Sequence, residues 1–250
     1  TVIAGYDEKD STSLNLEKKD YTKFLSEEVK GMKIGVPKEY FENIDERIEK
    51  KVWDGIKVLE SLGVSYEEIS LKLTKYALPS YYIIAMAEAS TNLAKFCGLR
   101  YGFSLPLKGN FNEYFSEVRG KGFGEEAKRR IMLGTFIRMA GYREAYYLKA
   151  LKVRRLIINE FKSVFKKFDA LVAPTMPILP PRFKDIENLE PVEIYMMDVL
   201  TVPPNLAGIP HISIPCGFIN GLPVGMHIMA DHLQEEKILK LAYAFEKTKK

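Results

Sequence analysis

The sequence predicts an α/β fold, in which a β-sheet is flanked by α-helices. Three observations carry this prediction. Residues 32–69 form a strand–helix–strand pattern, residues 169–174 form a short apolar run typical of a buried strand, and two further strand-like runs occupy residues 211–217 and 222–230. A strand–helix–strand pattern of this kind indicates a sheet with right-handed crossovers.

The first pattern begins at residues 32–37, a short apolar run that a proline closes. Residues 44–63 then show the spacing of an amphipathic helix, and Gly63 is a typical terminator. The apolar positions of this helix are Ile48, Val52, Ile56, Leu59 and Leu62. Residues 64–69 resume a strand.

Two helices are predicted in the middle of the chain. Pro79 can open the first in its initial turn, where a missing N–H costs nothing. One face of that helix carries Tyr81, Ala85, Glu88 and Asn92. The second is expected as one long helix over residues 121–150 that continues to Phe168.

The C-terminal third contains a long proline-rich loop at residues 175–193, and loops of this length are often functional. We expect a short helix around Asp198, a turn over residues 202–210, the two late strands and an amphipathic C-terminal helix.

Composition sets broad limits. A chain of 250 residues with 46% hydrophobic content can bury a substantial core, and no apolar run is long enough to span a membrane. The net charge of +4 permits a polyanion nearby without requiring one. Cys97 and Cys216 form neither a metal-ligand spacing nor a disulfide framework, so a reducing, cytoplasmic setting fits best. The start resembles an element already under way, which suggests a fragment or processed chain.

The residues alone give no complete active site. There is no Gly-x-Ser-x-Gly elbow and no phosphate-binding loop. His211, His227 and His232 lack the spacing of a zinc site, and the first two fall in predicted strands, where hydrogen-bonded core positions are the favoured interpretation. No catalytic or metal-binding residue is therefore predicted.

Arg129 and Arg130 are the first unusual feature, because two arginines lie at the edge of an apolar helix face. We expect one to point outward and the other towards the interior. A helical stripe is formed by Arg130, Gly134, Ile137 and Gly141. The stripe could hold a small anion against the guanidinium, or the glycines could let a neighbouring helix approach while Arg130 pairs with a structural acid.

Asp198 is the second unusual feature, because its neighbours Met196, Met197, Val199 and Leu200 are all apolar. A carboxylate in such company needs a cation or several donors. Alternatively it lies on a helix surface. Tyr81 and Tyr82 could present a hydroxyl to a pocket, or belong to ordinary core and rim.

Several segments resemble the C-terminal half of the amidase signature family, and within it the glutaminase subunits of tRNA-dependent amidotransferases. They are AGYDEKDSTS, YYIIAMAEASTNLAKFCGLRYG, GFGEEAKRRIMLGTF, DALVAPTMP and TVPPNLAGIPHISIPCG with GLPVGMHIM. The resemblance covers essentially residues 1–250. It implies the C-terminal part of the amidase signature fold, a mixed β-sheet flanked by helices, as half of a single domain.

The resemblance also implies site residues. Members of the family use a Ser–cis-Ser–Lys triad on a glycine- and serine-rich signature that this sequence lacks, so the chain alone is expected to be inactive. The α-carboxylate of glutamine calls for a planar bidentate donor and its α-ammonium for a carboxylate. The matching positions are Arg130 and Asp198, and Tyr81 matches a residue that lines the same pocket.

The implied reaction is glutamine hydrolysis by acyl transfer, which supplies ammonia for the conversion of Glu-tRNA(Gln) to Gln-tRNA(Gln). The implied partners are the B and C subunits of a heterotrimer, with tRNA bound through the complex and no membrane. No cofactor is expected in this chain, and ATP and Mg²⁺ belong to a partner subunit. The basic stripe from Lys149 to Lys166 is most simply a solvated helix face.

Two alternatives remain. The first is another amidase signature hydrolase that acts on a free carboxamide, although such an enzyme has little use for charges at Arg130 and Asp198. The second is a non-catalytic scaffold or interaction fragment. The sequence also departs from the family, because Arg138 and Arg143 stand where its members usually have small or aromatic residues.

Overall fold

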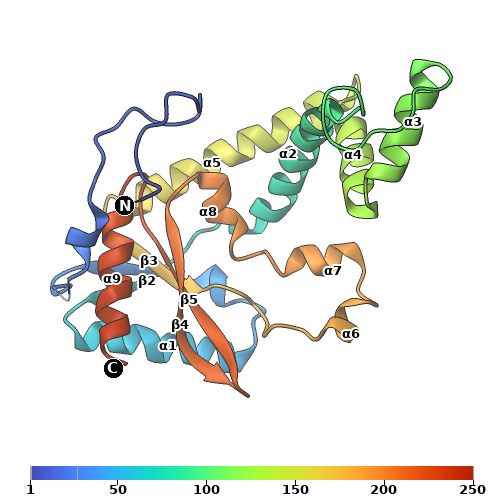
Figure 1. Cartoon of the computed structure of the whole chain (residues 1–250). Helices are drawn as coiled ribbons and strands as arrows, with labels where there is room; N and C mark the ends of the chain where they lie inside the picture. Colours follow the sequence, from blue (N-terminus) through green and yellow to red (C-terminus); the bar gives the residue numbers. More distant parts are fainter. Residues whose placement is uncertain (1, 27, 250) are drawn as a thin grey trace. The chain divides into compact units, whose positions relative to one another are not determined.

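The computed structural model describes residues 2–26 and 28–249 (Figure 1). The chain forms two compact units. The first contains the residues up to 75 and those from 157 onward, and the second contains residues 76–156. We call them the sheet unit and the helical unit.

The sheet unit is built on a five-stranded sheet in the order β2-β1-β3-β5-β4. Its strands are β1 (Lys33–Pro37), β2 (Ser65–Ile69), β3 (Ala170–Pro174), β4 (His211–Ile219) and β5 (Leu222–Met229). β1 runs parallel to β2 and β3, whereas β5 is antiparallel to β3 and β4. The sheet is therefore mixed, and all five predicted strands are confirmed.

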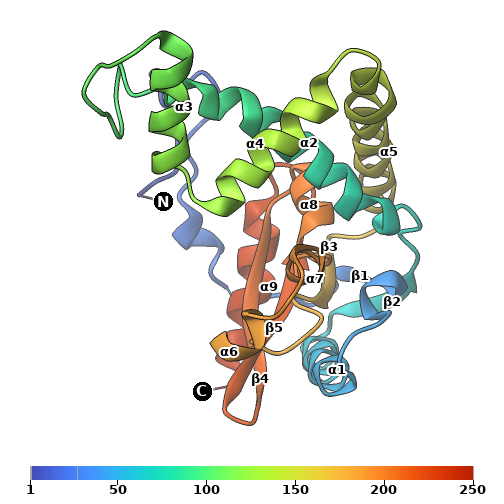
Figure 2. The same cartoon turned by 90° about the vertical axis from the view of Figure 1, so that its right-hand side faces the viewer.

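The antiparallel pair β4–β5 is a long hairpin (Figure 2). Asn220 and Gly221 connect its strands, and both have positive φ, at 51° and 80°. Asparagine and glycine adopt this left-handed conformation most easily, and the resulting tight turn matches the twist of the strands. The turn therefore fixes the register of the hairpin.

The longer helices of the sheet unit are α1 (Glu46–Ser61) and α9 (Glu235–Lys247). The Asp45 carboxylate caps α1 by accepting a hydrogen bond from the backbone N–H of Arg47, and Gly63 follows its end at φ +89°. The shorter helical segments are η1 (Tyr21–Phe24), η2 (Lys38–Phe41), α6 (Phe183–Ile186), α7 (Pro191–Met196) and α8 (Val202–Ala207).

The core of this unit lies where α1 and α9 pack against the sheet (Figure 1). Of the five apolar positions predicted for α1, the first four are buried and Leu62 is half-buried. The buried strand residues of the cluster alternate along each strand, as in Val224, Met226 and Ile228 of β5. The opposite set of β5 side chains, which includes His227, faces the other side of the sheet.

The helical unit contains α2 (Ala77–Asn92), η4 (Leu93–Lys95), α3 (Phe111–Gly122), α4 (Glu125–Arg138) and one π-helical turn, η5 (Glu144–Leu148). α2 and α4 pack against each other. α5 (Lys149–Val164) begins in the helical unit and ends in the sheet unit, and η3 (Thr74–Tyr76) lies at the other junction.

The predicted helix over residues 121–150 is wrong, because it is interrupted twice. Phe123 has an extended backbone between α3 and α4, and Met139 is extended at the end of α4. Gly141 then turns the chain at φ +84° before η5 begins. A spacing pattern does not register such breaks, because glycine and extended residues leave the apolar repeat unchanged.

Two predictions in the C-terminal third are also corrected. The predicted turn over residues 202–210 contains α8, which ends at Gly208 in the left-handed conformation. The predicted loop at residues 175–193 contains α6 and the beginning of α7. Prolines account for both errors, since Pro191 and Pro203 lie in the first turn of α7 and α8, where proline is tolerated.

Candidate functional site

Arg129 and Arg130 share one carboxylate. Both lie in the first half of α4, and Glu126 accepts a hydrogen bond from Arg130 Nε at 2.8 Å and another from Arg129 Nη1. The side chains of Arg129 and Arg130 are 39% and 33% exposed. The prediction that one points outward and one towards the interior is therefore wrong, because both reach back along the helix to the same acid.

Arg130 also lies near Tyr82 of α2. Its Cζ atom is 5.9 Å from the centroid of the Tyr82 ring, a distance at which a guanidinium interacts with a ring face. Tyr81 meets Tyr82 edge to face, with ring centroids 5.1 Å apart. The structure thus links Arg130 and Tyr81 through Tyr82, so two of the three predicted substrate residues lie in one cluster.

Gly134 serves helix packing. A Cβ atom on it would lie 1.9 Å from the carbonyl oxygen of Met86 in α2, so only glycine allows this approach. Gly141 lies beyond the end of α4 and does not belong to the stripe. The helix approach at Gly134 is therefore confirmed, whereas the binding of an anion by Arg130 stays a prediction.

Asp198 belongs to the sheet unit and lies in the turn between α7 and α8, so the predicted helix around it ends two residues earlier, at Met196. Its backbone carbonyl accepts hydrogen bonds from the N–H groups of Thr201 and Val202, which begin the next helix. The residue is exposed to solvent, so its apolar sequence neighbours do not enclose it.

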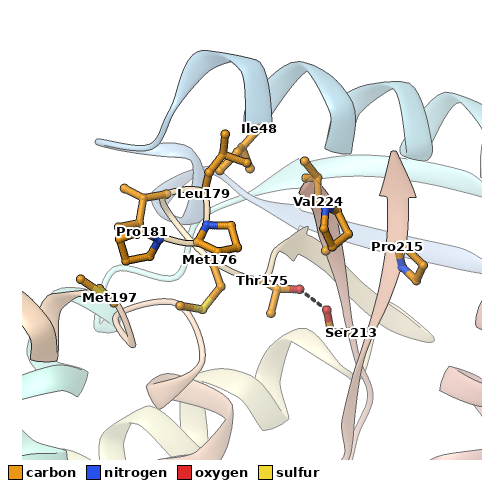
Figure 3. A pocket seen from close by; sticks show the side chains of 13 residues that line it. Ile48, Thr175, Met176, Leu179, Pro181, Met197, Ser213, Pro215 and Val224 are labelled. Atoms are coloured by element: carbon orange, nitrogen blue, oxygen red, sulfur yellow. Dashed lines mark hydrogen bonds between the residues drawn. The ribbon is translucent and has the colours of Figure 1, made fainter. Parts of the chain in front are cut away.

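The sheet unit also contains a cavity of about 590 Å³ (Figure 3). Its wall is mostly apolar and includes Ile48, Met176, Leu179, Met197 and Val224. Met197 precedes Asp198, but Asp198 itself is not among the lining residues. The cavity therefore favours an apolar group or a small uncharged molecule.

Two hydroxyl groups interrupt this apolar wall. Thr175 Oγ1 and Ser213 Oγ lie 2.7 Å apart and form a hydrogen bond (Figure 3). They meet across Gly225 of β5, where a Cβ atom would lie 2.5 Å from Ser213 Oγ and 2.8 Å from Thr175 Oγ1. Neither hydroxyl group was predicted from the sequence. The available signal was the position of Thr175 directly after a buried parallel strand, where α/β proteins often place functional groups.

His211 and His227 form a pair in which His227 is buried and His211 is half-buried. His227 is 1% exposed, and its Nε2 atom lies 2.8 Å from His211 Nδ1. Burial and the neighbouring His211 lower the pKa of His227 to about 3, and burial lowers the pKa of His211. Both rings are therefore neutral at physiological pH. The predicted core position is confirmed for His227, whereas His211 is only half-buried. Within residues 2–26 and 28–249, His227 Nδ1 has no hydrogen-bond partner.

His232 binds the backbone elsewhere, with Nε2 2.9 Å from the carbonyl oxygen of Ala207. Over the part of the chain that the structure describes, no group of three or more His, Cys, Asp or Glu side chains is arranged to hold a metal ion. Among the helices of the same residues, none combines the length and apolar character needed to cross a bilayer.

The family model of the amidases matches residues 1–239. The chain belongs to this amidase family. Similar solved structures include the A subunit of glutamyl-tRNA(Gln) amidotransferase from Thermotoga maritima, with a TM-score of 0.75 and 38% identity over 97% of this chain and 48% of that one. A bacterial aryl acylamidase, 21% identical with a TM-score of 0.71, shares the fold.

Among curated relatives, the chain is similar to the A subunit of glutamyl-tRNA(Gln) amidotransferase from several organisms. The protein from Methanosarcina mazei is 54% identical over 248 residues, which is 98% of this chain and 51% of the relative. The protein from a Geobacillus species is 50% identical over 98% of this chain and 50% of the relative. The chain therefore spans about half the length of the curated relatives it matches.

Proposed function

We propose that this chain forms part of the glutaminase subunit of the amidotransferase that converts Glu-tRNA(Gln) to Gln-tRNA(Gln). The observation that carries the proposal is the 54% identity with a protein of that name over 98% of the chain. The assembled enzyme would hydrolyse glutamine and pass the ammonia to a partner subunit. The chain would be half of a single amidase domain.

Arg130 is proposed to bind the α-carboxylate of glutamine. A planar guanidinium matches a carboxylate through two parallel hydrogen bonds, which a lysine cannot reproduce. Glu126 and Tyr82 support the assignment, because the hydrogen bond to Nε and the contact with the ring restrict the orientation of the guanidinium. Tyr81 is proposed to line the same pocket, since it packs against Tyr82.

Asp198 is proposed to bind the α-ammonium group. Its support is the exposed position in the turn between α7 and α8, where an incoming ligand can reach the carboxylate. The backbone hydrogen bonds to Thr201 and Val202 hold the turn in place. On binding, the two charged groups of glutamine would lose their interactions with water. They would gain interactions with one guanidinium and one carboxylate instead.

The chemistry of bond cleavage is assigned to other residues of the assembled enzyme. The sequence contains no glycine- and serine-rich signature for a Ser–cis-Ser–Lys triad. We therefore propose that this chain supplies pocket residues and no nucleophile. ATP and Mg²⁺ would be used by the B subunit, which with the C subunit completes a heterotrimer that binds tRNA. The cytoplasm is the proposed compartment, because Cys97 and Cys216 are free thiols.

The proposal is tested by combining the complete protein that contains these 250 residues with B and C subunits, Glu-tRNA(Gln), ATP, Mg²⁺ and glutamine. Formation of Gln-tRNA(Gln) is the expected result. A free-standing amidase would behave differently, because it would hydrolyse simple carboxamides without tRNA or partners and would not elute with them in gel filtration. That second outcome would overturn the proposal.

A further inference from the structure

A second polar site lies in the helical unit and does not include Arg130, Tyr81 or Tyr82. It is a pocket of about 390 Å³ where the C-terminal part of α2 meets the end of α4 and the turn into η5. Its polar lining consists of Glu88, Thr91, Asn92, Arg138, Arg143 and Tyr147. None of these residues is assigned to glutamine binding in the proposed function.

Two guanidinium groups line this pocket. Arg138 donates a hydrogen bond from Nη1 to the Thr91 hydroxyl, which holds one of them against α2. Arg143 is 54% exposed and lies 3.7 Å from Glu144, a distance too long for a strong ion pair. Paired guanidinium groups in a concave site favour a carboxylate or a phosphate.

Glu88 adds a negative charge to the lining of this pocket. Its carboxylate lines the same pocket and accepts a hydrogen bond of 3.4 Å from the Tyr147 hydroxyl. A ligand with negative charge alone would be repelled by Glu88. A ligand that carries an ammonium group as well as a carboxylate satisfies both signs of charge.

We propose that this pocket binds a free α-amino acid. Arg138 and Arg143 bind its α-carboxylate, and Glu88 binds its α-ammonium group. Asn92 can donate to and accept from a polar side chain of the ligand. The volume of about 390 Å³ leaves room for such a side chain, since small-molecule sites begin at roughly 300 Å³.

Isothermal titration calorimetry with glutamine, glutamate, asparagine and aspartate tests the proposal. The chain carries Arg130→Lys and Asp198→Asn, which weaken binding at those residues and so reduce its contribution to the measured heat. At least one amino acid is expected to bind. Glu88→Gln and Arg143→Gln should each weaken its binding roughly tenfold, the effect of losing one charged hydrogen bond. The matched control is Arg100→Gln, an exposed arginine of the same unit outside the pocket, which should leave binding unchanged.

Propionate and inorganic phosphate separate a zwitterion site from an anion site. Both lack an ammonium group, so Glu88→Gln should strengthen their binding while it weakens that of the amino acid. Three results would overturn the proposal: tighter binding of phosphate than of every amino acid, a Glu88→Gln effect of the same sign for both ligand classes, or no amino acid heat at about 10 mM, where even a weak site fills. Arg143→Lys retains the positive charge of this side chain. Equal melting temperatures for all variants would establish that each of them is folded.

Discussion

At the scale of single residues, Glu126 determines the arrangement of two neighbouring arginines. It accepts hydrogen bonds from both Arg129 and Arg130, so the two side chains are similar in exposure and in their acidic partner. Only Arg130 also lies near the Tyr82 ring. The pair therefore provides an internal comparison, because removing either guanidinium removes an ion pair with the same acid.

Arg130→Lys and Asp198→Asn should each impair the use of glutamine in the complete enzyme. The first keeps the charge but loses the planar fork, and the second keeps the shape but loses the charge. Each loss should cost about 1.5–3 kcal/mol of glutamine binding, the range for hydrogen bonds to charged groups. Amidation with added ammonia should persist, because ammonia bypasses the glutamine pocket. The measurement is the ratio of glutamine-driven to ammonia-driven amidation.

Arg129→Lys is the matched control for Arg130→Lys. It perturbs the same carboxylate on the same helix, yet the ratio should remain at the wild-type value. If Arg130→Lys and Asp198→Asn also leave the ratio unchanged, the two residues do not bind the α-groups of glutamine. A structural role for Arg130 would instead lower stability and both activities together.

The histidine pair should make stability depend on pH. Because the pKa of folded His227 is lowered from 6.5 to about 3, the unfolded chain binds more protons between these values. The free energy of unfolding should therefore fall as the pH drops below 6.5. The contribution of this one residue is at most about 1.4 kcal/mol per pH unit.

His227→Gln removes this titration. Chemical denaturation at several values between pH 4 and 8 gives the free energy of unfolding of the wild-type chain and of the variant as a function of pH. The carboxylates contribute equally to both curves, so they cancel in the difference. The difference between the two free energies of unfolding should be constant near pH 8. As the pH falls, the wild-type chain should lose more stability than the variant. Parallel curves over the whole range would show that His227 does not resist protonation in the fold.

At the scale of whole elements, a glycine in α4 allows the close contact between α2 and α4. Gly134 lies against the backbone of Met86, and its neighbour Ile137 is buried in the same helix. The exposed side chains of α4 include Met132 and Phe136. Several apolar residues of this helix therefore lie on the surface rather than in the core. The backbone contact at Gly134 accounts for the packing of this helix better than its apolar face does.

Gly134→Ala should disrupt the helical unit. A Cβ atom 1.9 Å from a carbonyl oxygen forces the helices apart, and overpacking of this kind costs about 3 kcal/mol or more. Gly120→Ala is the control, because no heavy atom lies within 4 Å of a Cβ there; it should gain up to about 1 kcal/mol from helix propensity. Thermal unfolding followed by circular dichroism compares them. Equal melting temperatures for Gly134→Ala and wild type would contradict the packing argument.

At the scale of the whole molecule, the chain contains two compact units and spans about half of its curated relatives. The proposed glutamine residues are divided between those units, with Arg130 and Tyr81 in the helical unit and Asp198 in the sheet unit.

The purified chain should release no ammonia from glutamine, because its sequence lacks the nucleophile and base implied by the family. A coupled glutamate dehydrogenase assay measures ammonia directly. The control is the complete enzyme with its partners under the same conditions. Ammonia release by the chain above the buffer background would refute the assignment of bond cleavage to other residues.

The sequence by itself determined the elements whose signals are local. The strands near residues 32–37, 64–69 and 169–174 follow from short apolar runs, and α1 follows from apolar spacing between Asp45 and Gly63. Backbone preferences and periodic burial act over a few residues, so they can be read along the chain. The mixed sheet came from family resemblance, because strand direction depends on pairing between distant segments.

Only the tertiary structure decided which side chains meet. Glu126 and Arg130 are close in sequence, but Tyr82 reaches Arg130 from another helix. Thr175 and Ser213 form their hydrogen bond because Gly225 between them has no side chain. The end of α4 and the exposure of Asp198 were likewise invisible in the sequence. The free energy of each arrangement comes from contacts between residues far apart in the chain, and apolar spacing carries no information about those contacts.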